Sequence, residues 1–359
     1  MKKEVDVLVI DQFLEILNLI SFEVIGLFGV FFAISFFWKN IFAYLPLKPY
    51  HSKQRLHQDE IPRIAGLIIY LFLSIVALFL VKSHYLNVIL ISALPLVLIG
   101  SKEDLFHNTT PKLRLFMMTL SAGLFIFLLP TQLPEIDFPL IDQILTFDFM
   151  REVFFIFSIL VIINGNNLID GVNGNLAFTN IIQLISLALL AFIVGDDIII
   201  QLTSLLIIPL IPFVLYNFPF GKIFCGDAGA YFYGFAISTS VIYLFGTYDD
   251  LLSWNAILIL VYPSIELLFS FIRKKFFENK SAFTADAKHL HSLIYRYKNK
   301  QNSKCSNNSV AIFFLLPFIL TPLLTYFIYR DIFAILFSLS LMFVLYIIMY
   351  MYLLNKLSK

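Results

Sequence analysis

Long runs of apolar residues dominate the chain, and short polar segments separate them. A helix needs about 20 mostly apolar residues to cross a bilayer, and about eleven runs approach or reach that length. The runs are continuous rather than alternating, which favours helices over the strands of a membrane barrel. The pattern therefore predicts an all-α polytopic membrane protein with about eleven spans. These lie at roughly 17–38, 64–81, 85–100, 114–130, 153–166, 177–195, 198–215, 229–246, 251–271, 308–329 and 331–353.

The composition supports the same reading. Of 359 residues, 60% are hydrophobic and 14% are charged, which is more apolar surface than one soluble core can bury. The lipid bilayer is thus an expected partner. No internal repeat is visible, so we interpret residues 1–359 as a single integral membrane domain. The net charge is +1 and no basic arm is present, which argues against nucleic acid as a partner.

The distribution of Lys and Arg predicts the orientation. If the amino terminus lies outside, 20 of the 25 basic residues fall in inside segments, and the other five are Lys2, Lys3, Lys82, Arg151 and Arg330. By the positive-inside rule, the inside loops are then cytoplasmic. These loops span 39–63, 101–113, 167–176, 216–228 and 272–307. Both cysteines, Cys225 and Cys305, fall in them, so a disulfide is not expected.

The first two inside loops carry charges beside helix ends. Arg55, His57 and Arg63 precede the second span and suit either headgroup anchoring or phosphate recognition. In the second loop, adjacent carboxylates at Glu103 and Asp104 face the basic residues Lys112 and Arg114. Like charges at a membrane boundary raise one another's pKa, which suits a cation site or proton handling, and a solvated helix end is an equal alternative.

The third and fourth loops are rich in amides and glycine. Six polar residues lie in NGNNLIDGVNGN, a number that helix capping does not explain: Asn164, Asn166, Asn167, Asp170, Asn173 and Asn175. Such a segment at membrane depth is tolerated where it lines a wet cavity. In the fourth loop, Asp227 stands between glycines at the start of a helix. This place suits Mg²⁺ and phosphate, although an ordinary helix cap is the alternative.

The fifth loop contains His289 and His291 in a basic setting. Two residues apart, they do not share a helical face, so a helical zinc pair is not expected, whereas an extended loop would let both meet a phosphate. All five polar clusters, with five of the six histidines, fall on the predicted cytoplasmic side. Acids, amides, histidines and basic side chains together predict a site for Mg²⁺-assisted phosphoryl transfer.

In this order the motifs resemble those of the polyprenyl-phosphate N-acetylhexosamine-1-phosphate transferases, also called glycosyltransferase family 4. The resemblance covers about residues 45–295 and runs through RLHQDEIPRIAG, EDLFHNTTPKLRL, NLIDGVNG, KIFCGDAGAYFYGF and FTADAKHLH. The family includes the enzymes that begin O-antigen, other lipopolysaccharide glycans and teichoic-acid linkage units, and it is related to phospho-MurNAc-pentapeptide transferase. The HLH triplet resembles the branch that uses UDP-N-acetylhexosamines.

The resemblance implies transfer of a sugar 1-phosphate, with N-acetylglucosamine as the first choice, from a UDP-sugar to undecaprenyl phosphate, with release of UMP. It implies a multi-pass protein of the bacterial inner membrane with a cytoplasmic-face active site; a homodimer stays open. Mg²⁺ is the implied cofactor and Mn²⁺ the alternative. Asp227 would hold the metal, with Asp170 or Asp104 as the alternative ligand, and these three with Glu103 form the implied catalytic set. Substrates would contact Arg55, His57, Arg63, Lys112, Asn167, Asn173, His289 and His291.

Four departures from the family pattern stand out. The acidic pair, usually two aspartates, is Glu103–Asp104, which makes Asp104 the better candidate for the strict role. Asn173 replaces a common second aspartate, Glu266 replaces an intramembrane aspartate, and the paired glycine after PR is Ala65–Gly66. A transporter of polyprenyl lipid or ions is the alternative function, and a silent scaffold is a third. A transporter, however, would place its polar residues near the midplane of an inverted repeat.

Overall fold

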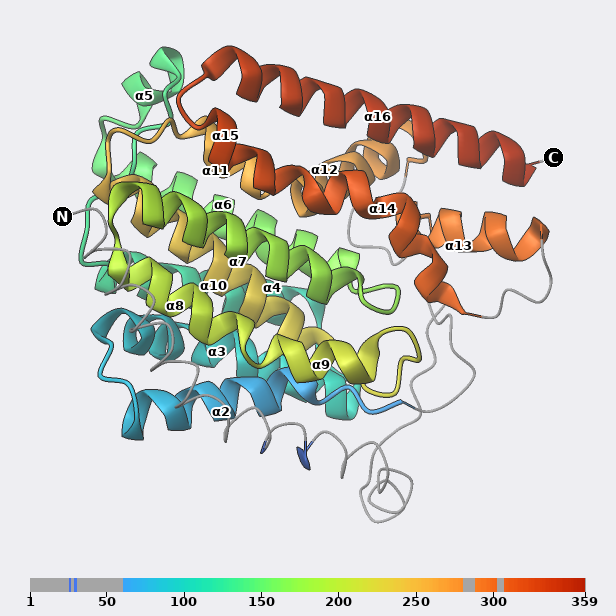
Figure 1. Ribbon diagram of the computed structural model, residues 1–359, viewed down its shortest axis with the longest axis horizontal. Helices are drawn as coiled ribbons and strands as arrows, with labels where there is room; N and C mark the ends of the chain where they lie inside the picture. Colours follow the sequence, from blue (N-terminus) through green and yellow to red (C-terminus); the bar gives the residue numbers. More distant parts are fainter. Residues whose placement is uncertain (1–25, 27–28, 31–60, 280–287, 302–306, 359) are drawn as a thin grey trace, which may run out of the picture.

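The structure is a computed structural model that describes residue 26 and residues 29–30, 61–279, 288–301 and 307–358. These residues form a bundle of helices that run roughly along one direction (Figure 1). Within them, eight helical segments are long and apolar enough to cross a membrane, judged by length and composition. The predicted all-α polytopic fold is confirmed. Most of the span predicted at 17–38 lies outside the described residues, as do Arg55 and His57 of the first loop.

The eight segments correspond to predicted spans. Five are single long helices: α3 (His84–Phe106), α4 (Pro111–Leu128), α6 (Asp148–Ile169), α7 (Asn175–Val194) and α10 (Gly226–Thr247). A sixth combines α8 (Asp197–Ile207) and α9 (Leu210–Asn217), which meet around Pro209. A seventh covers η2 (Asn308–Val310), α14 (Ala311–Leu320), η3 (Thr321–Leu324) and α15 (Thr325–Ile328). The last is α16 (Ile332–Ser358).

Two predicted spans differ from a single long helix. The run at 64–81 forms α2 (Ala65–Phe79), which has 15 residues. The run at 251–271 is divided at Leu260 into α11 (Trp254–Ile259) and α12 (Val261–Ile272). The count of eleven spans therefore stays a prediction.

Two connections contain helices that the apolar pattern did not predict. The connection at 131–152 contains the short helix α5 (Pro139–Ile144). The fifth inside loop begins with a π-helical turn, η1 (Arg273–Phe277), and contains α13 (Leu290–Gln301). The histidine segment is not wholly extended, because His291 lies in the first turn of α13. Both helices are short or polar, so neither leaves the long apolar signature of a span.

Helix α10 is the centre of the bundle and is buried along its length. It packs against α2, α3, α6 and α7. Small residues permit this close packing: a Cβ atom on Gly66 of α2 would lie 2.1 Å from the backbone nitrogen of Gly229, and one on Gly100 of α3 would lie 2.6 Å from the Cα of Ala228. The start of α10 is therefore held tightly between two helices, which positions the residues that follow Cys225.

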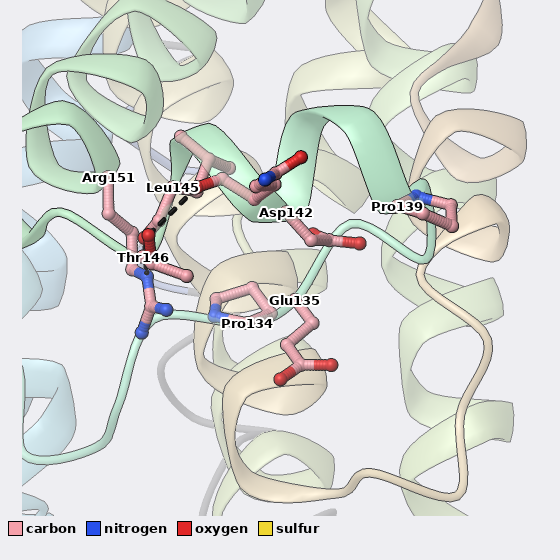
Figure 2. A pocket seen from close by; sticks show the side chains of 8 residues that line it. Pro134, Glu135, Pro139, Asp142, Leu145, Thr146 and Arg151 are labelled. Carbon is pink, nitrogen blue, oxygen red and sulfur yellow. Dashed lines mark hydrogen bonds between the residues drawn. The ribbon is translucent and has the colours of Figure 1, made fainter.

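The two ends of the bundle carry different features. The α9–α10 connection and α13 lie at one end, and α5 and the α15–α16 turn lie at the other (Figure 1). A pocket at the α5 end is lined by residues of the 131–152 connection, including Glu135, Asp142 and Arg151 (Figure 2). Asp142 accepts hydrogen bonds from the backbone nitrogens of Ile136 and Phe138, both at 2.8 Å, so it stabilises this connection. No predicted site residue lines the pocket.

The orientation can be tested with single cysteines at exposed positions of the two ends. Thr146→Cys lies at the α5 end, and Asn299→Cys lies on α13. Because the basic residues predict that α13 is cytoplasmic, a membrane-impermeant maleimide should label Thr146→Cys in intact cells and Asn299→Cys only after permeabilisation. The parent chain is the control for its own two cysteines. If only Asn299→Cys were labelled in intact cells, α13 would lie outside the cell and the predicted topology would be wrong.

Candidate active site

The start of α10 is bound by a carboxylate from α3. Asp104 accepts hydrogen bonds from the backbone nitrogens of Asp227, at 2.8 Å, and Ala228, at 2.9 Å. These N–H groups have no partner within the helix, and the helix dipole favours a negative charge beside them. Gly226 has φ +75°, and a Cβ there would lie 2.5 Å from Asp104 Oδ2. Glycine is therefore required at position 226 by both the backbone and the close carboxylate.

Asp227 is the centre of the cluster, because four side chains donate to its carboxylate. Oδ1 accepts from Arg63 Nη2 at 3.1 Å and from Asn167 Nδ2 at 3.2 Å. Oδ2 accepts from Arg114 Nη1 at 3.3 Å and from the Tyr231 hydroxyl at 2.8 Å. The donors come from the segment before α2 and from α4, α6 and α10. The structure thus brings Arg63, Asn167 and Asp227 together.

Arg63 joins two of the predicted catalytic carboxylates. Its Nε lies 3.2 Å from Asp104 Oδ1, while Nη2 reaches Asp227. The backbone around it is fixed to the chain before α10: Phe224 N donates to Pro62 O at 2.9 Å, and Gly66 N donates to Cys225 O at 3.0 Å. The PRIAG segment and the FCGDAG segment are thus one structural unit, although they lie far apart in sequence.

Asp170 ends α6 beside the same cluster. Burial raises the pKa of this carboxyl to about 7; Arg63 lowers it, Asp227 raises it, and a hydrogen bond with the Gly226 backbone lowers it. Asp170 is therefore a third acidic group next to Asp104 and Asp227, and one that titrates near neutral pH.

The amide-rich segment serves mainly to build the structure. Asn167 contacts Asp227 and Asp170 lies beside it, whereas the other four asparagines bond to other parts of the bundle. Asn173 Nδ2 donates to Pro219 O at 2.9 Å and its backbone nitrogen donates to Asn308 Oδ1 at 3.1 Å. Asn166 Nδ2 donates to Ala230 O at 2.9 Å, which joins α6 to α10. The number of amides thus reflects backbone connections as well as the cluster itself.

The adjacent acids of the second loop have different surroundings. Glu103 accepts a hydrogen bond from Thr109 N at 3.0 Å and another from the Thr109 hydroxyl, so it stabilises the turn between α3 and α4. Asp104 faces α10 instead. Lys112 is exposed at the start of α4, and Arg114, two residues later, binds Asp227. The structure therefore brings Asp104 and Arg114 into the cluster rather than Glu103 and Lys112.

His289 and His291, the two histidines predicted to bind substrate, are buried near the amide-rich segment. His289 Nδ1 lies 3.0 Å from Glu266 Oε1, and the two histidine rings stack with centroids 5.7 Å apart. A Cβ on Gly171 would lie 2.0 Å from His291 Nε2, which places this ring against the residue after Asp170. Burial lowers the pKa of His291 to about 4, with Glu266 raising it and His289 lowering it. At neutral pH His291 is therefore uncharged and offers hydrogen bonds rather than positive charge.

Sequence reasoning missed two members of the cluster, Arg114 and Tyr231. Arg114 was visible in the second loop, but nothing in the sequence separated it from Lys112. Tyr231 lies four residues after Asp227, a spacing that places two side chains on the same face of a helix. This spacing could have indicated the contact between them.

The oxygen donors fit a hard divalent cation. Among the described residues, no group of three or more His, Cys, Asp or Glu side chains is arranged to hold a metal ion without further ligands. Mg²⁺ is typically held by one or two carboxylates together with water and substrate phosphates, and Asp227 and Asp170 could supply the carboxylates. Both oxygens of Asp104 already accept backbone hydrogen bonds, which makes it the poorer ligand. Arg63 and Arg114 would have to leave Asp227, and their partly exposed side chains have room to turn.

Comparison with known proteins agrees with the motif resemblance. Residues 86–245 match the family described as glycosyl transferase family 4. A Bacillus subtilis protein named "probable undecaprenyl-phosphate N-acetylglucosaminyl 1-phosphate transferase" is 27% identical over 75% of this chain and 74% of its own length. Proteins named undecaprenyl-phosphate alpha-N-acetylglucosaminyl 1-phosphate transferase are similar in Thermotoga maritima, at 25% identity over 68% of this chain and 72% of the relative, and in Yersinia pestis, at 23% over 77% of each. The predicted resemblance is confirmed.

The raised pKa of Asp170 predicts a pH-dependent stability. Between about pH 4 and pH 7 the folded chain holds a proton that the unfolded chain has released, because the folded pKa is about 7 and the ordinary value is 3.8. This contribution to stability is complete below pH 3.8 and is lost as the pH rises through about 7. Asp170→Asn, which stays uncharged, should therefore melt at a higher temperature than the parent chain at pH 8 and at a similar temperature at pH 4.

The measurement is thermal unfolding in detergent with a chelator present, so that divalent cations do not bind Asp170. Asp250→Asn, at an exposed position after α10, is a control for the general effect of removing a carboxylate. Equal melting temperatures of Asp170→Asn and the parent chain at pH 8 would show that Asp170 is not destabilised by its surroundings.

Proposed function

We propose, from the similarity of this chain to family-4 glycosyl transferases, that it transfers an N-acetylhexosamine 1-phosphate from a UDP-sugar to undecaprenyl phosphate and releases UMP. N-acetylglucosamine is the first choice of sugar, because the three named relatives all carry it in their names. The reaction belongs to the transferases that pass a substituted phosphate to another phosphate.

The observation that carries this proposal is the cluster around Asp227. Three carboxylates, two arginines and the Asn167 amide converge where α3, α4, α6 and α10 meet. Arginine suits phosphate oxygens because its planar guanidinium presents paired donors. A site that must hold two phosphorylated substrates needs both these cations and the acids that balance them. The cluster lies at the bundle end that the basic residues predict to be cytoplasmic, where a UDP-sugar is available.

Mg²⁺ is the proposed cofactor, held by Asp227 and Asp170. When bound it would neutralise the donor diphosphate and polarise its phosphorus. Arg63 and Arg114, which bind Asp227 in the structure, would then turn to the substrate phosphates. Asp104 would keep the start of α10 in place during this exchange, because it binds backbone rather than side chains.

The transfer exchanges one diphosphate bond for another. An oxygen of the lipid phosphate attacks the phosphorus that bears the sugar, and a new phosphorus–oxygen bond forms. The bond from that phosphorus to the UMP oxygen breaks, and UMP leaves with the electron pair. The anomeric bond of the sugar stays intact. Because the bonds formed and broken are of the same kind, the equilibrium constant should lie near unity and added UMP should reverse the reaction.

The leaving group gives the sharpest test of this proposal. Membranes that contain the protein are incubated with undecaprenyl phosphate, Mg²⁺ and a UDP-sugar labelled in the sugar, using UDP-N-acetylglucosamine and UDP-N-acetylgalactosamine in parallel. We expect label in the lipid fraction, UMP in equal amount, and loss of the labelled lipid when UMP is added. Release of UDP would identify an ordinary glycosyltransferase and contradict the proposal.

Asp227→Asn is the matched inactive control for this assay. The variant keeps the size of the side chain but removes the charge that two arginines and the proposed metal require. Its two arginine partners are partly exposed side chains that can turn to water, and the asparagine oxygen can still accept from the Tyr231 hydroxyl, so the variant should insert and fold. Transfer should fall to the background of membranes without the protein.

A further inference from the structure

Glu266 of α12 is buried, 1% exposed, and joins three parts of the chain. Oε1 lies 3.0 Å from His289 Nδ1 and accepts from the backbone nitrogen of Leu290 at 3.1 Å. Oε2 accepts from the Tyr346 hydroxyl of α16 at 3.0 Å. A buried carboxylate is expensive unless such donors satisfy it. Glu266 is thus fixed between the histidine segment and the carboxyl-terminal helix.

Helix α16 also contacts the histidine segment directly. The Tyr350 hydroxyl donates to the backbone oxygen of Lys288 at 3.0 Å. The rings of Tyr346 and Tyr350 stack with centroids 6.2 Å apart, and both pack edge-on against Phe269 of α12, at 5.1 and 4.5 Å. Tyr350 therefore binds this segment directly, and Tyr346, one helical turn away, is joined to it through Glu266.

A line of contacts continues from these tyrosines to the acidic cluster. His289, held by Glu266, stacks on His291 with an angle of 7° between the rings. His291 is 2% exposed and lies against Gly171, next to Asp170. Its Nδ1 atom is buried with no hydrogen-bond partner in the described part of the chain. The other ring nitrogen, Nε2, is the one that faces Gly171, so it is Nε2 that the contacts of His289 and His291 place beside the end of α6.

We propose that Tyr346 and Tyr350 are positioning residues, which hold His289 and His291 beside Asp170 through Glu266 and the Lys288 backbone. Helix α16 lies outside residues 86–245, the part of the chain that matches the family. That His289 and His291 contact the UDP-sugar rests on the proposed function. That α16 holds the two histidines in place does not rest on it.

The kinetic test uses Tyr346→Phe, which keeps the ring packing and removes one hydroxyl. Loss of a hydrogen bond to a carboxylate corresponds to about a tenfold effect or more. We expect the KM for the UDP-sugar to rise about tenfold, while the KM for undecaprenyl phosphate stays unchanged. Tyr85→Phe is the matched control: this tyrosine is also buried and donates to Thr239 O at 2.9 Å, at the other end of α3. It should change neither KM.

A double variant tests whether Tyr346 acts through Glu266. Glu266→Leu keeps a similar size and removes both acceptor oxygens. If the tyrosine acts through this carboxylate, adding Tyr346→Phe to Glu266→Leu should lower kcat/KM no further. Independent, multiplying losses would overturn the proposal.

A chemical readout needs no transferase activity. Diethyl pyrocarbonate modifies accessible imidazoles, and the modified peptides of the solubilised protein are quantified by mass spectrometry. His289 and His291 should react about tenfold faster in Tyr346→Phe than in the parent chain, and at the parent rate in Tyr85→Phe. Parent-like reactivity in Tyr346→Phe would overturn the positioning role. Faster reactivity in a chain whose parent transfers no sugar phosphate would support that role and contradict the proposed function.

Discussion

Two backbone N–H groups at the start of α10 donate to the carboxylate of Asp104, and the position of the other site residues depends on this contact. It fixes α10 relative to α3, where Gly100 and Ala228 are too close for a larger residue. Once α10 is fixed, Asp227 faces Arg63, Arg114 and Asn167. A carboxylate buried at a membrane boundary is unfavourable by itself, but two backbone donors, a helix dipole and an arginine satisfy it.

Charge balance then determines what the cluster can bind. Asp104 and Asp227 are matched by Arg63 and Arg114, and Asp170 is the additional acid, with its pKa raised to about 7. A divalent cation together with a diphosphate could replace the arginine contacts of Asp227 with little change in net charge. Such an exchange of ionic partners requires that the arginine side chains can change rotamer while the backbone at the start of α10 stays fixed. The arginines are partly exposed, and Asp104 is bound to backbone.

The apolar runs predicted the long helices, because a bilayer span leaves an unmistakable length of apolar sequence. They could not predict α5 or α13, which are short or polar, nor the division between α11 and α12. At the site, the sequence predicted the acidic pair but not that its two carboxylates bind different parts of the structure. Neighbouring positions differ by about 100° around a helix, so Asp104 faces α10 while Glu103 holds the turn at Thr109. The same geometry selects Arg114 over Lys112, since only the contacts between helices decide which faces the centre.

The stability and activity of Asp104→Asn test the central claim most directly. Asparagine can accept at its carbonyl oxygen but would place an NH₂ group against the second backbone donor, so one buried N–H would lose its partner. The free energy of unfolding should fall by about 1–3 kcal/mol, and sugar-phosphate transfer should be lost with it. A variant with the melting temperature and transfer rate of the parent chain would show that Asp104 does not hold the start of α10, and would contradict this account.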